Sequence, residues 1–140
     1  MTNVKPTAGY SQRSLVEKLG IKAGQRIALM HAPTDYTDLL GPLPAGVSQV
    51  QTLATGLDFV HFFTTSRAEL LAYFPDLKAA IVTSGMIWVS WPKKAAKVAT
   101  DLDENVVREI GLAIGLVDVK VAAIDPVWSG LKFVYRKADR

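Results

Sequence analysis

The sequence predicts an α/β fold in three layers, with helices on both faces of a mostly parallel sheet of about six strands. Strand-like segments alternate with segments of helical periodicity, which implies right-handed crossovers between parallel strands. The last two strand segments, 117–124 and 131–137, are joined by a turn too short for a crossover, so the C-terminal strand must be antiparallel. Leu57–Phe63 is almost continuously apolar, as expected of a central strand that is buried on both faces.

The order of the elements follows from their apolar patterns and their turn residues. We expect one sheet built from six segments: 26–30, 47–53, 57–64, 86–91, 117–124 and 131–137. Before the first strand, Ser14 and Glu17 have the spacing of a capping box, and Gly20 closes the short helix that they open. A second brief helix follows the first strand and ends at Gly41.

Two longer helices are predicted in the second half of the chain. Ser66 and Glu69 have capping-box spacing and open a helix that Pro75 restarts or kinks and that Ser84-Gly85 ends. The next helix opens with the acidic stretch 101–104 and ends at Gly115. A glutamate or aspartate in the first turn suits the positive end of a helix dipole.

Composition limits the classes of function. The chain has 140 residues, which suits one domain: we expect a flexible tail at 1–10 and a single α/β domain at 11–140. The 16 basic and 13 acidic residues give a net charge of only +3 and are spread along the chain, so we expect neither a nucleic-acid nor a membrane partner. There is no cysteine, no signal-peptide pattern and no apolar run of membrane-spanning length, so a cytoplasmic location is expected.

The predicted topology resembles the Rossmann-like sheet of class I methyltransferases, which ends in a helix, a strand and an antiparallel strand. Residues 77–91, LKAAIVTSGMIWVSW, resemble the late helix, glycine turn and strand of that family. A crossover is missing after 47–53, so the resemblance implies a reduced version of the fold.

Six blocks of the linear sequence resemble a small family of bacterial proteins, mostly actinobacterial, whose function is unassigned. The blocks are KLGIKAGQR (18–26), GPLP (41–44), VSWPKK (89–94), DLDENVVRE (101–109), GLVDVK (115–120) and AIDPVWSGLKF (123–133). This resemblance implies a bacterial cytoplasmic protein and supplies neither an activity nor a catalytic residue.

The residues argue against a methyl-donor or dinucleotide site. Such a site needs a glycine-rich turn after the first strand, where backbone N–H groups can approach the ligand. Here the turn 31–36 contains no glycine, Pro33 lacks an N–H, and Asp35 and Asp38 place negative charge on the following helix. The end of strand 47–53 carries no carboxylate for a ribose. We therefore expect no cofactor.

Polar and aromatic side chains gather at the carboxyl edge of the predicted sheet, where open α/β sheets bind ligands. The candidate ligand-binding residues are His31, Arg67, Ser90, Trp91, Lys93, Lys94, Asp125 and Trp128. Arg67 places a cation in the first turn of its helix, whereas aspartates follow the other helix starts at this edge, and together with the two lysines it favours an anionic ligand. The alternative interpretation is structural: the lysines solvate a loop, and the two tryptophans cover the open end of the core.

No residue is assigned a catalytic or metal-binding role. His61 lies among phenylalanines and is expected to be a hydrogen-bonded core residue, the serines lack a nucleophile-elbow motif, and the histidines lack metal-ligand spacing. Two classes of function remain. The favoured class is a non-catalytic module that binds a small anionic ligand or a protein partner. The alternative is a divergent methyltransferase-like or other transferase with a degenerate cofactor site, in which His31 or Asp125 acts as acid or base. The oligomeric state is left open.

Overall fold

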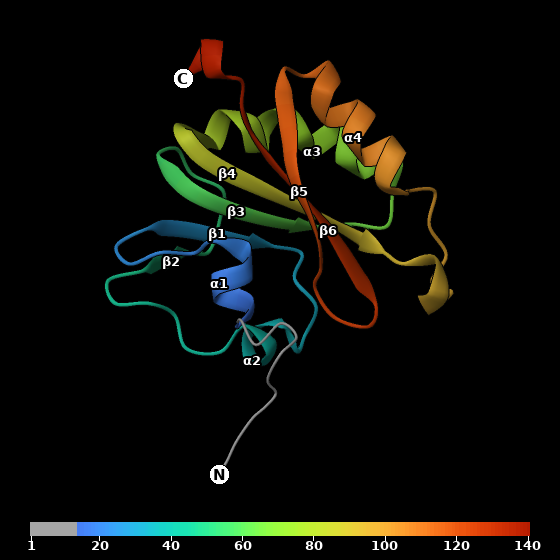
Figure 1. Ribbon diagram of the computed structural model, residues 1–140, viewed down its shortest axis with the longest axis horizontal. Helices are drawn as coiled ribbons and strands as arrows, with labels where there is room; N and C mark the ends of the chain where they lie inside the picture. The colour runs from blue at the N-terminus through green and yellow to red at the C-terminus, as the bar shows by residue number, and fades with distance from the viewer. Residues whose placement is uncertain (1–13) are drawn as a thin grey trace.

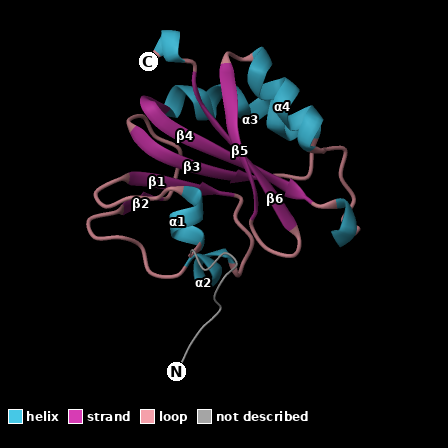
Figure 2. Ribbon diagram, in the orientation of Figure 1, coloured by secondary structure: helices cyan, strands magenta, loops and turns pink. Residues whose placement is uncertain are grey.

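The computed structural model describes residues 14–140, and the predicted tail at 1–10 lies outside the described residues. A six-stranded sheet separates two helical layers (Figure 1). Helices α1 (Leu15–Leu19) and α2 (Tyr36–Leu40) cover one face of the sheet, and α3 (Arg67–Ala80) and α4 (Glu104–Ala113) cover the other (Figure 2). The three predicted layers are therefore present.

The strands are β1 (Arg26–Met30), β2 (Ser48–Val50), β3 (Leu57–Phe63), β4 (Ile81–Pro92), β5 (Leu116–Ala123) and β6 (Trp128–Tyr135). Their order in the sheet is β2-β1-β3-β4-β6-β5. Neighbours among β1 to β4 pair in parallel, whereas β6 is antiparallel to both β4 and β5. The fold class and the single antiparallel strand are thus confirmed. The described residues also form two short 3-10 helices, η2 (Lys94–Ala96) and η3 (Lys137–Asp139).

The core is divided by the sheet into two apolar clusters. On the α3 and α4 face, Phe74, Val107 and Phe133 belong to one cluster; on the α1 and α2 face, Leu19 and Trp88 belong to the other. Successive residues of β3 point into opposite clusters, which confirms that this strand is buried on both faces. The indole N–H of Trp88 donates to the carbonyl of Leu19 at 2.8 Å and ties α1 to the sheet.

The predicted capping signals are present in part. The capping box of Ser14 and Glu17 is complete, and Gly20 has the left-handed φ of 88° that a helix-closing glycine adopts. At α3 only half of the box forms: the Ser66 hydroxyl accepts from the backbone N–H of Glu69. The Glu69 carboxylate instead accepts from the hydroxyl of Thr64 at 2.5 Å.

The predicted boundary between α3 and β4 is wrong. The helix runs through Pro75, ends at Ala80 and gives way directly to β4 at Ile81, rather than continuing to Ser84-Gly85. Because the pairing of β3 with β4 shifts register between Leu57 and Phe59, the early residues of β4 form an irregular stretch. Gly85 fits closely there, since a Cβ would lie 3.0 Å from the carbonyl oxygen of Val82 and 3.1 Å from that of Asp58.

Helix α4 begins later than the acidic stretch 101–104 predicts. Asp103 is its N-cap and accepts from the backbone N–H of Val106, while Asp101 accepts from the backbone N–H of Arg67 at 2.7 Å. Helix α4 ends before Gly115, which has a φ of 93°. None of the helices formed by residues 14–140 is long and apolar enough to cross a membrane.

Candidate functional site

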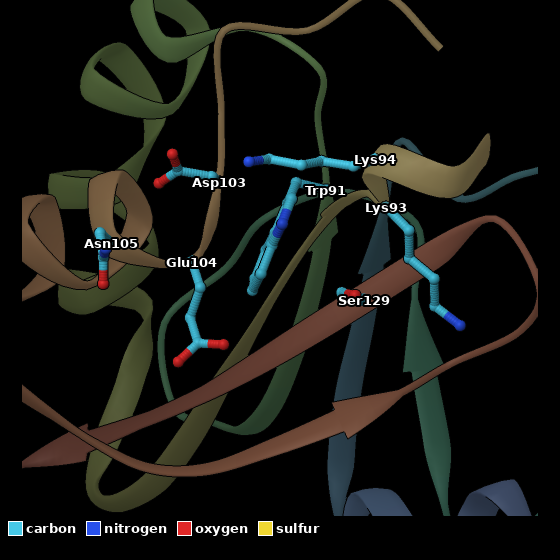
Figure 3. A pocket seen from close by; sticks show the side chains of 7 residues that line it. All are labelled: Trp91, Lys93, Lys94, Asp103, Glu104, Asn105 and Ser129. Atoms are coloured by element: carbon cyan, nitrogen blue, oxygen red, sulfur yellow. The ribbon is translucent and has the colours of Figure 1, made fainter. Parts of the chain in front are cut away.

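A cavity of about 330 Å³ opens at the carboxyl edge of the sheet, beyond the end of β4 (Figure 3). It lies between the last residues of β4, the first turn of α4 and the start of β6. Its lining residues are Trp91, Lys93, Lys94, Asp103, Glu104, Asn105 and Ser129. This is the edge at which open α/β sheets bind their ligands.

The sheet register brings the lining residues together. Trp91 pairs with Ser129 across the antiparallel ladder of β4 and β6, and Pro92 pairs with Trp128. Beyond Pro92, the backbone N–H of Lys93 donates to the carbonyl of Val127 at 2.8 Å, which fixes the exit of the chain from the sheet. The chain then returns to the start of α4, so both ends of this connection border the cavity.

The acidic side chains of the cavity are already bonded to other residues of the protein. Asp103 caps α4 through the backbone N–H of Val106 at 2.9 Å. Glu104 forms a salt bridge with Arg108 at 2.6 Å, and Arg108 also bonds Asp118 at 2.8 Å on β5. These bonds hold both carboxylates at the α4 wall, and Arg108 offsets part of the Glu104 charge.

The two lysines are not engaged. The ammonium groups of Lys93 and Lys94 form no hydrogen bond or salt bridge with any residue from 14 to 140. The Lys94 side chain extends toward Asp103 across the cavity, and Lys93 points away along the start of β6 (Figure 3). The charged groups still available to a ligand in this cavity are therefore these two cations.

Trp91 supplies an apolar wall. It is 5% exposed and belongs to the core cluster on the α3 and α4 face, together with Leu102. The predicted covering of the core by Trp91 is confirmed, and the same ring borders the cavity. The Ser129 hydroxyl and the Asn105 amide add neutral polar groups to the lining.

His31, the candidate at the end of β1, lies apart from these lining residues. It has a φ of 57°, in the left-handed region that residues other than glycine seldom adopt. Its ring packs against Phe62 and Tyr73, with centroid distances of 5.1 and 5.3 Å. Its Nδ1 lies 3.7 Å from a carboxylate oxygen of Glu69. His31 therefore lies between the end of β1 and the first turns of α3.

Ser90 points away from the cavity and is fully buried in a polar network. His61 Nε2 lies 2.7 Å from the Ser90 hydroxyl, and its Nδ1 lies 2.6 Å from the hydroxyl of Tyr36. The expectation that His61 is a hydrogen-bonded core residue is confirmed. Burial lowers the pKa of His61 to about 3 and raises the pKa of Tyr36 far above its usual range. The network is thus uncharged at neutral pH.

Asp125 and Trp128 shape the turn between β5 and β6. The Asp125 carboxylate accepts from the backbone N–H groups of Val127 and Trp128 at 2.8 and 2.7 Å. Trp128 packs edge-on against Phe63 at 5.2 Å, on the α1 and α2 face of the sheet. Both residues therefore support the cavity edge without lining it.

Arg67 lines a different cavity. This second cavity, of about 270 Å³, lies between α3 and α4 and is also bordered by Leu71, Glu109 and Ile114. The expectation that the start of α3 is not met by a carboxylate is wrong, because Asp101 accepts from the backbone N–H of Arg67 and Glu69 lies in the first turn. Asp101 comes from a distant loop, and the local sequence of α3 gives no indication of its contact.

The structure thus brings three of the eight candidates into one cavity, namely Trp91, Lys93 and Lys94. Four lining residues were not among the candidates: Asp103, Glu104, Asn105 and Ser129. Three of them, Asp103, Glu104 and Asn105, lie at the start of α4, which follows a strand that ends at this edge. Their position in the sequence could therefore have indicated them as candidates. Within the described part of the chain, no group of three or more His, Asp or Glu side chains is placed to hold a metal ion.

Comparisons with known proteins identify the fold. No protein-family model and no curated protein matches the chain. Among solved structures, the magnesium protoporphyrin IX methyltransferase of Synechocystis PCC 6803 aligns with a TM-score of 0.55 and 12% identity, over 87% of this chain and 78% of that one. A SAM-dependent methyltransferase from Aquifex aeolicus aligns with a TM-score of 0.57 and 14% identity, over 85% and 86%.

A third solved structure, the complex of DhpI with SAH, aligns with a TM-score of 0.61 and 13% identity, over 89% of this chain and 83% of that one. Identities this low show the fold alone. The chain has the α/β fold of class I methyltransferases.

Proposed function

We propose that this protein is a non-catalytic binding module that holds a small anionic ligand in the cavity beyond β4. The observation that carries the proposal is that the basic side chains of the cavity lack bonding partners, whereas its acidic side chains have them. Lys93 and Lys94 are its only charged side chains without a bond to another residue between 14 and 140, whereas Asp103 and Glu104 are both bonded. An anion supplies the missing partner.

The lining also indicates the rest of the ligand. The flat face of Trp91 suits a planar or apolar body, and Ser129 and Asn105 offer hydrogen bonds to neutral polar groups. A volume of about 330 Å³ suits a metabolite-sized molecule. The lining includes no histidine, and hence no histidine base for the Ser129 hydroxyl, so the lining favours binding over a reaction.

The test begins with a thermal-shift screen of small organic anions, because a ligand that binds only the native state raises the melting temperature. Anions that raise it are then titrated calorimetrically against a Lys93→Ala/Lys94→Ala variant. We expect the free energy of unfolding of the variant to lie within about 0.5 kcal/mol of that of the wild type, since surface charges contribute little to stability. We expect it to bind at least tenfold more weakly, and high salt to weaken binding to the wild type.

A Lys137→Ala/Arg140→Ala variant is the matched control. It removes two positive charges from exposed positions beyond the other end of β6. Equal affinities of the two variants for the same anion, with equal salt dependence, would refute the proposal. The other anionic ligand that these lysines could bind is an acidic segment of a protein partner. Binding to acidic peptides but to no small anion would assign the lysines to a protein interface.

The alternative is a divergent methyltransferase-like or other transferase, and the fold is the observation that favours it. The residues do not fit a methyl donor. The turn after β1 contains Pro33 and no glycine, and α2 that follows is only five residues long. Gln51 and Thr52, rather than a carboxylate, follow β2. The carboxylate of Asp58 is bonded to the backbone N–H of Arg26 at 2.8 Å.

Calorimetric titration with S-adenosylmethionine separates the two readings. We expect no binding at micromolar concentrations, because no glycine turn is present to offer N–H groups to the donor. Micromolar affinity would make the transferase the better reading. The blocks of linear sequence support a further part of the proposal, that the chain belongs to a bacterial family of cytoplasmic proteins.

A further inference from the structure

A second group of basic side chains lies where the end of α1 meets β5 and β6. Four lysines from three parts of the chain form this lysine cluster. They are Lys18 at the end of α1, Lys22 in the turn after it, Lys120 on β5 and Lys132 on β6. Lys120 and Lys132 are direct cross-strand partners in the antiparallel ladder. Like charges directly opposite each other destabilise a sheet, so this pairing calls for an explanation.

Two of the ammonium groups are held in place by backbone carbonyls. Lys120 Nζ donates to the carbonyl of Lys18 at 3.1 Å, and Lys18 Nζ donates to the carbonyl of Ala123 at 3.2 Å. Lys132 Nζ lies beside Gly20, since a Cβ on that glycine would be 3.9 Å away. These two bonds join the end of α1 to β5, and the Lys132 ammonium group lies beside the same end of α1.

The cluster has no acidic partner among residues 14–140. No salt bridge joins any of the four lysines to a carboxylate of residues 14–140, and the Glu17 carboxylate of α1 accepts from Ser14. Lys132 is half-buried, and burial, followed by the charges of Lys120 and Lys22, lowers its pKa. The cluster therefore combines partial desolvation with repulsion between like charges.

A structural role for the lysines explains only part of this arrangement. Cations near the end of a helix stabilise its free carbonyls, and Lys120 does this for α1. The side chains of Lys22 and Lys132 donate to no carbonyl of the described residues, so helix capping does not account for them. What all four share is a positive charge without a salt bridge to any carboxylate of residues 14–140.

We propose that the lysine cluster is a second anion site, which binds the phosphate group of a small phosphorylated molecule. A phosphate carries a charge near −2 and three acceptor oxygens, so it can bond several ammonium groups at once, whereas a carboxylate offers one charge. Lysine binds phosphate as a point charge, and the cluster supplies such charges from three parts of the chain. Two of them are already oriented by carbonyls, which lowers the entropy lost on binding.

The test uses inorganic phosphate and pyrophosphate as probes, titrated calorimetrically at constant ionic strength with chloride as the reference anion. Three proteins are compared with the wild type: Lys132→Met, which keeps the long apolar stem; Lys22→Ala, which changes an exposed side chain; and Lys93→Ala/Lys94→Ala. We expect the first two to bind pyrophosphate at least tenfold more weakly and the third to bind it like the wild type. Amide resonances of Gly20 and Ile21 should shift on titration.

Lys132→Met has a second expected effect that a merely structural lysine would not produce. Without ligand, it should melt at the same or a higher temperature than the wild type, because it removes a half-buried cation repelled by its neighbours. If this variant fails to fold, Lys22→Ala still tests the site. Unchanged pyrophosphate affinity in Lys22→Ala, or loss of binding only in Lys93→Ala/Lys94→Ala, would overturn the proposal. Binding to anionic vesicles or oligonucleotides without binding to phosphate or pyrophosphate would overturn it as well.

Discussion

His61 lies wholly inside the protein, and its burial should make the stability of the fold depend on pH. The side chain has 0% exposure and is bonded to the hydroxyls of Tyr36 and Ser90. Burial disfavours the charged imidazolium and lowers the pKa to about 3. The folded protein therefore keeps His61 neutral, whereas the unfolded chain takes up a proton as the pH falls through the ordinary pKa of about 6.5.

The size of the effect follows from this difference in proton uptake. The stability that neutral His61 contributes is fully present above pH 6.5 and is lost as the pH falls toward the folded pKa of about 3. By linkage, the free energy of unfolding should fall by about 2 kcal/mol between pH 7.5 and 5, with a slope approaching about 1.4 kcal/mol per pH unit. Below about pH 5 the carboxylates also titrate, so the window above it isolates the histidine.

Urea unfolding at steps of half a pH unit from 7.5 to 5 measures this slope. The comparison is with His61→Gln, whose amide can still bond Tyr36 and Ser90 but does not titrate. We expect the variant to be less stable at pH 7.5 and to lose about 2 kcal/mol less than the wild type across the window. A His31→Gln variant reports the share of the other, exposed histidine. The reasoning is refuted if wild type and His61→Gln lose the same free energy of unfolding.

Two further changes test the packing and the capping of α4. Gly111→Ala should destabilise the fold by about 1–3 kcal/mol in urea unfolding, because a Cβ there would lie 2.7 Å from Cδ1 of Phe133 and closer still to Cε1. A second substitution, Phe133→Leu, should relieve part of the loss, and a fully tolerated alanine would contradict the packing. Asp103→Ala should cost about 1 kcal/mol by removing the acceptor for the Val106 N–H, whereas Asp103→Asn should recover most of it. Equal stabilities of the alanine and asparagine variants would show that the cap contributes nothing.

Local patterns were sufficient for most of the fold. The apolar run Leu57–Phe63, the capping box at Ser14 and the short turn between β5 and β6 each depend on residues close together in the chain, and all three are present. The boundary of α3 was not predictable in this way. The segment after Ala80 pairs with the start of β3, and that pairing, rather than the local sequence, makes it a strand.

The candidate site likewise combines features that the local sequence predicts with features that depend on tertiary contacts. The sequence alone shows that Lys93 and Lys94 follow a strand and a proline, and hence that they lie at the carboxyl edge; in the structure Lys94 is exposed and Lys93 is half-buried. Only the tertiary structure decided which neighbours share their cavity. Ser90 and Trp91 are adjacent, yet the alternation of a strand sends one into the His61 network and the other to the cavity wall. The backbone N–H of Arg67 donates to Asp101 from a distant loop, and Lys132 lies opposite Lys120 because the register of β5 and β6 pairs them. Contacts between residues far apart in the chain arise from sheet register and helix packing, which no local pattern encodes.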